Sequence, residues 1–224
     1  MVEVVIAKYK EDTAWTSGLT HPYVIYDKSD TPLPTSIPLP NVGREAHTFL
    51  YHIVETYGNL ADITVFLQGK PEDHTSVGLD ACISYINRLT GKEEFTPFLT
   101  YSYCDPDFAC YPFIDRAEIF RDPIVTYSED ASEHNCLSIP QLIISGIVKV
   151  PTFAAGAQYV VPKANILARP LEFWKKLLEL SKTNTYHDRD FRRLDPWAFE
   201  RIWVLLYTDV PMNPDFLLES LSST

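Results

Sequence analysis

The sequence of 224 residues predicts an α/β domain with a mixed, mostly parallel β-sheet that is flanked by helices. Two short β-branched runs, Val2–Ala7 and Ile63–Leu67, have the length and composition of buried strands. A third strand-like run, Tyr23–Tyr26, and a helical pattern over residues 44–57 lie between them. The resulting order of strand, strand, helix, strand is typical of sheets in which parallel strands are joined by helices.

The helix over residues 44–57 follows a loop, Ser29–Pro40, that holds four prolines. Asn41 or the turn at Gly43 begins this helix, and Glu45 brings a negative charge to its first turn, where such a charge is favourable. Its core face consists of apolar residues at helical spacing: Ala46, Phe49, Leu50, Ile53, Val54 and Tyr57. Further along the chain we expect helices over 77–89, 170–181 and 197–207, and strands over 148–153 and 158–161.

Composition excludes several classes of protein. The hydrophobic content of 46% and charged content of 22% are typical of a globular chain. The net charge of −11 argues against a general nucleic-acid binder, which needs a basic surface. The four cysteines form no C-x-x-C pair, so we expect reduced, mostly buried thiols. No apolar run is long enough to span a membrane. We therefore expect one soluble, cytoplasmic domain over residues 1–224.

The start of the helix at residue 44 is the most informative candidate site. It lies between two predicted strands, and free N–H groups at a helix N-terminus favour a phosphate. Arg44 adds a planar guanidinium that suits a diphosphate. The alternative is structural: an N-terminal salt bridge, with His47 and His52 as surface histidines.

Other candidate ligand groups follow the ends of the first two strands, where open α/β sheets bind their ligands. After the first strand, Tyr9 has a ring that stacks on a base, and Glu11 and Asp12 accept hydrogen bonds. Asp27, at the end of the second strand, suits ribose hydroxyls or a base. The structural alternatives are a solvated charged loop and a turn aspartate.

Asp73 and His74 follow the third strand and offer oxygen and nitrogen ligands for magnesium or manganese. The alternative there is a helix N-cap. Glu200 interrupts the apolar helix predicted over residues 197–207, and a carboxylate in such a place is costly unless paired or functional. It suits a general base, or an ion pair with Arg169, Arg192 or Arg193.

Several of these segments resemble one family. Its motifs correspond here to residues 7–12, the run LPNVGREAHT at 39–48, VFLQG at 65–69 with Asp73 and His74, residues 156–159, and WAFERIW at 197–203. The chain is identified by them as a member of a widespread microbial domain family of unknown function, over residues 2–207. That family in turn resembles the GT-A nucleotide-sugar glycosyltransferases in the order of its elements.

The second resemblance implies transfer of a sugar from a nucleotide-diphosphate donor to a hydroxyl of a glycan or glycoconjugate acceptor. It implies a catalytic role for Glu200 as base and for Asp73, with Mn²⁺ or Mg²⁺ on Asp73 and His74. The residues that it implies for donor binding are Tyr9, Glu11, Asp27, Asn41, Arg44 and Gln68. Those that it implies on the acceptor side are Gln158, Tyr159 and Trp197.

Two other hypotheses remain open from the sequence. A metal-assisted hydrolase would use Asp73, His74 and His47 with a further carboxylate, and it requires a compact metal cluster. A carbohydrate-binding or interaction module without catalysis would display the aromatic-rich stretch from residue 101 to 113.

Overall fold

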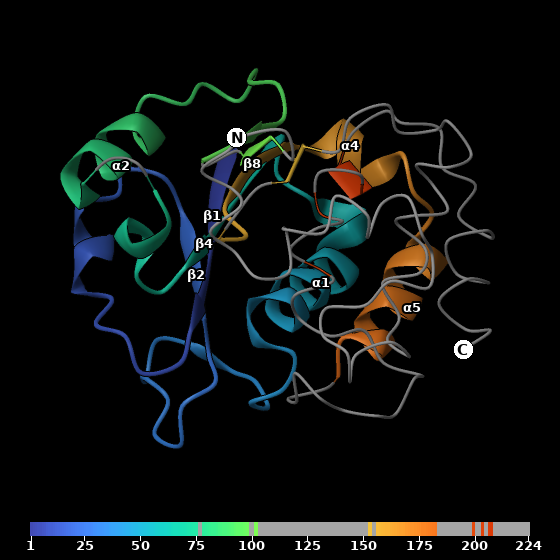
Figure 1. The fold of residues 1–224 in the computed structure, drawn as a ribbon, viewed down its shortest axis with the longest axis horizontal. Helices are drawn as coiled ribbons and strands as arrows, with labels where there is room; N and C mark the ends of the chain where they lie inside the picture. The colour runs from blue at the N-terminus through green and yellow to red at the C-terminus, as the bar shows by residue number, and fades with distance from the viewer. Residues whose placement is uncertain are drawn as a thin grey trace.

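The structure is a computed structural model that describes residues 1–75, 78–98, 101–102, 152–153, 156–182, 199, 203 and 206–207. A twisted sheet lies at its centre, with helices on both faces (Figure 1). Within these residues the sheet has six strands in the order β3-β2-β1-β4-β8-β5. These strands are β1 (Val2–Lys8), β2 (Tyr23–Asp27), β3 (Ile37–Pro38), β4 (Ile63–Gln68), β5 (Thr96–Pro97) and β8 (Tyr159–Pro162).

Strand pairing confirms the predicted mixed, mostly parallel sheet. β1 pairs in parallel with both β2 and β4, and β2 pairs in parallel with β3. β8 is antiparallel to both of its neighbours, β4 and β5. Two further strands, β6 (Tyr101–Ser102) and β7 (Thr152–Phe153), form a separate antiparallel pair.

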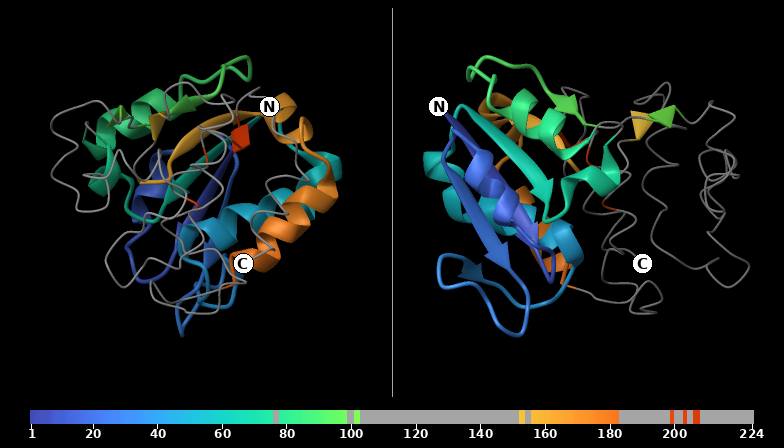
Figure 2. Two further views of the ribbon diagram at one scale, coloured as in Figure 1. Left: turned by 45° about the vertical axis from the view of Figure 1, so that its right-hand side comes forward. Right: turned by 90° about the vertical axis from the view of Figure 1, so that its left-hand side faces the viewer.

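The helices form a layer on each face of the sheet. α1 (Arg44–Thr56), α4 (Lys163–Leu167) and α5 (Leu171–Leu180) lie on one side, and α2 (Leu79–Ile86) lies on the other (Figure 1). α1 and α5 run side by side in all the views (Figure 2). The short 3₁₀ helices are η1 (Ala14–Gly18), η2 (Tyr57–Asn59) and η3 (Pro71–His74).

Alternation along β1 divides the buried side chains between the two faces. Val5 packs into the cluster that contains α1 and α5, whereas Val4 and Ile6 pack into the cluster that contains α2. The α1 side also holds an aromatic cluster in which the rings of Trp203 and Tyr207 stack with centroids 5.3 Å apart. The parallel strands are therefore covered on both faces, as their β-branched composition predicted.

Most of the described elements lie close to the predicted ranges. α1 ends one residue before the predicted helix, and α5 begins after Pro170, which is its N-cap rather than its first residue. α2 is shorter than the predicted helix over 77–89, because Gly78 is its N-cap and Asn87 its C-cap. Phe199, Trp203, Leu206 and Tyr207 are helical, as expected for the helix over 197–207. In the described residues no helix is long and apolar enough to cross a membrane.

Candidate functional site

The candidate site lies where the direction of strand connection changes. β1 is the first strand of the chain, β2 adds to one of its edges, and β4 adds to the other after α1. The carboxyl ends of these strands meet, because Lys8 is opposite Asp27 and Ala7 is opposite Gln68. In open α/β sheets this switch point leaves a crevice beyond the strand ends that binds ligands.

A cavity of about 160 Å³ occupies this switch point. It is lined from β1 and its following loop, from the end of β2, from the start of α1 and from the end of β4. We call it the inner pocket. Its lining residues are Ala7, Lys8, Tyr9, Glu11, Lys28, Asn41, Arg44, Glu45 and Gln68.

The inner pocket brings together five of the six side chains that sequence reasoning placed on the donor side. These are Tyr9, Glu11, Asn41, Arg44 and Gln68. They come from three segments that are far apart in the sequence, so their meeting is a consequence of the strand order. The sixth, Asp27, lies behind the pocket wall rather than in it.

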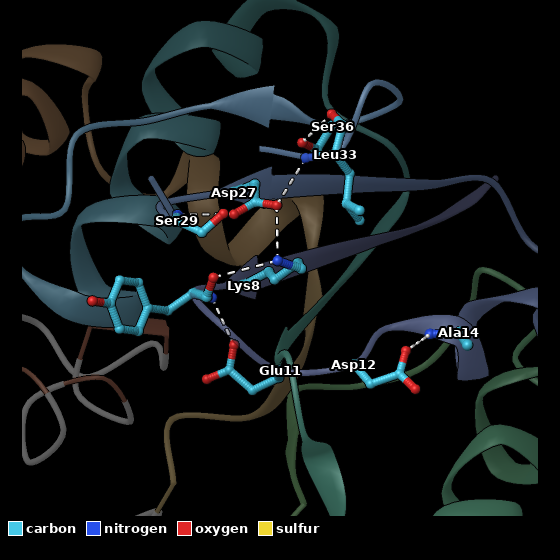
Figure 3. A network of polar contacts seen from close by, with 9 residues as sticks. Lys8, Glu11, Asp12, Ala14, Asp27, Ser29, Leu33 and Ser36 are labelled. Carbon is cyan, nitrogen blue, oxygen red and sulfur yellow. Dashed lines mark hydrogen bonds and ion pairs between the residues drawn. The ribbon is translucent and has the colours of Figure 1, made fainter. Parts of the chain in front are cut away.

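Asp27 is fully buried, and its carboxylate holds the wall of the site together (Figure 3). Its Oδ2 lies 2.9 Å from Lys8 Nζ and accepts a hydrogen bond from the Leu33 N–H, while its Oδ1 accepts from the Ser29 N–H. Burial raises the pKa of the Asp27 carboxyl, but the hydrogen bonds from Ser29, Lys8 and Leu33 outweigh it and hold the pKa below its usual value. With these bonds made, Asp27 positions Lys8 and the proline-rich loop.

A second, larger cavity lies against the same β1 loop and has a volume of about 590 Å³. We call it the outer pocket. Lys8, Tyr9 and Glu11 line both pockets, so the β1 loop separates them. The other walls of the outer pocket come from the loop before η1, from β2 and from the proline-rich loop, and include Thr13, Tyr23, Ile25, Thr31 and Leu33.

The β1 loop is fastened to the end of β4. The Glu11 carboxylate accepts a hydrogen bond from the Tyr9 N–H at 2.6 Å, and Asp12 accepts one from the Ala14 N–H (Figure 3). Trp15 Nε1 donates to the Gly69 carbonyl at 2.9 Å. Glu11 packs directly on Gly69, where an added Cβ would lie only 2.8 Å from its Oε2. The position of Glu11 therefore depends on a glycine at 69.

The start of α1 is an unusual turn. Gly43, the N-cap residue, has a φ of 60°, and Arg44 after it has a φ of 47°. Within the described part of the chain, this end of the helix has no side-chain capping hydrogen bond. A Cβ on Gly43 would lie 2.0 Å from the Ser181 carbonyl oxygen, which shows how closely the end of α5 approaches the turn.

Lys28 is the functional candidate that sequence reasoning missed. Its side chain is only 5% exposed, and its Nζ donates to the carbonyl oxygens of Val42, at 2.6 Å, and of Arg44. Burial lowers the pKa of the Lys28 amine to about 7, although the nearby Glu45 carboxylate acts in the opposite direction. A lysine directly after a strand-end aspartate, Asp27, is the sequence signal that could have revealed it.

The structure corrects the expectation that His47 and His52 are surface histidines. They are only 3% and 1% exposed, because α1 is covered by the sheet on one side and by α5 on another. His52 Nδ1 lies 3.1 Å from the Tyr26 hydroxyl. Burial lowers the pKa of both rings to about 4, and for His47 the positive charges of Lys28 and Lys182 contribute. Both histidines are therefore neutral at pH 7.

On the predicted acceptor side, the Gln158 and Tyr159 side chains are fully buried. Gln158 Nε2 donates to the carbonyls of Pro71 and His74 at 3.0 and 3.1 Å, and its Oε1 accepts from the Gln68 N–H. Tyr159 belongs to the aromatic cluster with Trp203 and Tyr207. Neither side chain is accessible to an acceptor, because Gln158 is bonded to residues of β4 and η3 and Tyr159 is packed in the aromatic cluster. Trp197 and Glu200 lie outside the described residues.

The Asp73–His74 pair does not form a metal centre with the described residues. Asp73 is half exposed and pairs with Lys70 at 2.7 Å. His74 packs against Gly156, where a Cβ would lie 2.2 Å from His74 Cβ. No group of three or more His, Cys, Asp or Glu residues in the described ranges could hold a metal ion, and this includes the set with His47 that a hydrolase would need. Asp73 is also not a helix cap, since Lys70 is the N-cap of η3 and Gly78 that of α2.

The strand order and the two pockets define this protein as an open α/β domain with two cavities at the topological switch point. The chain belongs to the family described as Protein of unknown function (DUF3431), whose model matches residues 4–215. The expectation of a domain family of unknown function is confirmed, over nearly the same residues. A search of curated proteins finds no match to this chain, and a search of solved structures finds none either.

Proposed function

We propose that the protein binds a nucleotide-diphosphate sugar at the switch point and transfers the sugar to a hydroxyl of a glycan or glycoconjugate, as a GT-A-like glycosyltransferase. One observation carries the proposal. The inner pocket gathers Tyr9, Glu11, Asn41, Arg44 and Gln68 beyond the carboxyl ends of β1 and β4. The order β3-β2-β1-β4 supports it, since a nucleotide in such a sheet lies over the strands at the switch point.

The chemistry of the two pockets suggests how the donor would be divided between them. The inner pocket would take the diphosphate, because Arg44 and Lys28 line it and bring positive charge to the start of α1, the end of a helix that favours an anion. The outer pocket would take the nucleoside, with the half-exposed ring of Tyr9 as a stacking surface and threonine hydroxyls as polar partners. Asp27 would act through Lys8, whose ammonium it holds at the boundary.

The GT-A resemblance implies a divalent metal, and the described residues around Asp73 do not fit one, because Lys70 occupies Asp73 and no third ligand lies beside His74. In the proposal the charge of the diphosphate is met by Arg44 and Lys28. Glu200 is the proposed base for the acceptor hydroxyl, on the sequence argument that a carboxylate in an apolar helix needs a functional or paired role.

Titration calorimetry tests the binding step. Uridine, guanosine and adenosine diphosphates and their sugar conjugates would be titrated with and without manganese. We expect at least one to bind, and we expect Arg44→Ala to weaken that binding by about tenfold or more. Arg88→Ala is the matched control, because Arg88 is also exposed and lines neither pocket. If the wild-type protein binds none of these compounds, the proposal fails.

A second experiment separates transfer from binding. With a bound donor identified, release of the nucleoside diphosphate would be measured with glycan acceptors present. Glu200→Gln should leave donor affinity unchanged and should slow release by about a hundredfold or more. If wild type binds the donor but releases no nucleoside diphosphate, the chain is a binding module rather than a transferase. If Glu200→Gln releases it as fast as wild type, Glu200 is not the base.

A further inference from the structure

Lys28 is a buried lysine whose amine makes fewer hydrogen bonds than an ammonium group can donate. An ammonium group has three N–H donors. Two of them are used by the carbonyls of Val42 and Arg44, on either side of Gly43 in the turn that starts α1. Among the described residues no third hydrogen bond of the Lys28 Nζ is found, and Lys28 lines the inner pocket. One donor of a buried cation is thus left over beside a cavity.

The two carbonyl bonds also give Lys28 a fixed direction. Val42 and Arg44 flank a turn whose backbone is left-handed at Gly43 and at Arg44, and the Lys28 Nζ ties the two sides of that turn together. A phosphate that approaches the start of α1 would therefore meet a Lys28 amine that the turn already holds in place. Such preorganisation lowers the ordering cost of binding.

We propose that Lys28 is the phosphate-specificity residue of the inner pocket, and that it donates its remaining N–H to a phosphate oxygen of the ligand. The inference rests on the proposed function, in that the ligand is a nucleoside diphosphate or its sugar conjugate. It goes further by assigning the preference for the phosphorylated ligand over the bare nucleoside to one residue. Arg44, which is exposed, would contribute from the mouth of the pocket.

If Lys28 binds the phosphate, the affinity for the ligand should also depend on the protonation state of Lys28. Burial lowers the pKa of the Lys28 amine to about 7, so the amine is partly neutral at physiological pH. A bound phosphate favours the ammonium form, so binding above pH 7 takes up a proton and weakens as the pH rises. The charged or titratable groups around Lys28 are Lys8, Glu11 and Asp27 from the strand ends, Arg44, Glu45 and His47 from α1, and Lys182 after α5.

The test compares a nucleoside, its diphosphate and its diphosphate sugar on wild type, Lys28→Met and Lys28→Arg. We expect Lys28→Met to lose about tenfold to a hundredfold in affinity for both phosphorylated ligands and to keep its affinity for the nucleoside. Lys28→Arg should recover only part, because the guanidinium does not fit the two-carbonyl geometry. Lys176→Met is the matched control, since Lys176 is an exposed lysine on α5 that lines neither pocket.

The pH dependence is measured first on the wild-type protein with the diphosphate sugar, because its doubly esterified diphosphate does not titrate near neutrality. Wild-type affinity should fall between about pH 7 and about pH 9, with proton uptake visible as a buffer-dependent binding enthalpy, and Lys28→Met should lack both. The inference is wrong if Lys28→Met prefers the diphosphate over the nucleoside as strongly as wild type does. If Lys28→Met does not fold, the inference is wrong if the affinity of wild type for the diphosphate sugar does not change with pH. If wild type binds no phosphorylated ligand at all, the proposed function fails first.

Discussion

The Lys8 ammonium lies 2.9 Å from the Asp27 carboxylate, and both side chains are buried at the ends of neighbouring parallel strands. Lys8 lines both pockets, so this ion pair belongs to the wall that they share. The backbone bonds that Asp27 accepts from Ser29 and Leu33 extend the same network into the proline-rich loop (Figure 3). The shape of the cleft and the stability of the fold therefore depend on the same few atoms.

Asp27→Ala should cost about 3–5 kcal/mol in the free energy of unfolding, because it leaves the Lys8 charge buried without its partner. Urea denaturation followed by fluorescence measures this. Asp30→Ala, at an exposed aspartate in the next loop, should change stability by less than about 0.5 kcal/mol. Equal effects of the two substitutions would show that the buried pair contributes nothing specific.

Gly43→Ala should destabilise the protein by about 2 kcal/mol or more. The left-handed φ of 60° is unfavourable for alanine, and the new Cβ would lie 2.0 Å from the Ser181 carbonyl oxygen. Gly58→Ala is the control, because no described residue lies within 4 Å of a Cβ there. The melting temperatures of both variants, compared with that of wild type, test this prediction. A Gly43→Ala protein that melts with wild type would mean that the end of α5 does not press on this turn.

Gln158→Leu should cost about 2 kcal/mol or more, since it leaves the Gln68 N–H and the carbonyls of Pro71 and His74 without their buried partner. Asn87→Leu removes a comparable set of bonds, to Thr20 and Gly18, from an exposed site where water replaces them. We expect the second loss to be smaller, at about 1 kcal/mol or less. Chemical denaturation of the pair compares them, and a larger loss for Asn87→Leu would contradict the importance of the buried amide.

Acid should destabilise the protein through His47 and His52. Their pKa values are lowered to about 4 in the folded state, so the unfolded chain binds more protons between pH 6.5 and pH 4 and stability falls over that window as the pH is lowered. Each histidine contributes on the order of 3 kcal/mol. His47→Gln and His52→Gln should each flatten the curve of unfolding free energy against pH. An unchanged slope would mean that these rings protonate without unfolding.

Sequence reasoning identified the parts of the fold that depend on local pattern. The β-branched runs at the start and at residue 63 are strands, and the helix from Arg44 follows its predicted core face. The meeting of five pocket residues also followed from strand order, because parallel strands place their carboxyl ends at one edge. Each of these features has its physical cause in the residue pattern of a short stretch of sequence or in the order of such stretches.

The remaining features depend on contacts between distant segments. His52 reads as polar and exposed in a helical projection, yet α5, more than a hundred residues later, helps to cover α1. Gln158 and Tyr159 were expected to be accessible, because nothing in the sequence around β8 indicates that this strand pairs antiparallel with β4 inside the sheet. The burial of Lys28 could not be predicted from the sequence, because its amine is bound by the carbonyls of Val42 and Arg44, which lie 14 and 16 residues further along the chain.

The position of β8 has a consequence for how this protein can be made. β8 lies between β4 and β5, although it follows β4 by about ninety residues in the chain. During synthesis, the ribosome therefore exposes β4 as an unpaired edge until residues 159–162 emerge, and unpaired edges invite aggregation. Expression of residues 1–98 alone should give insoluble material, and a chaperone that shields nascent strands should raise the yield of the full chain.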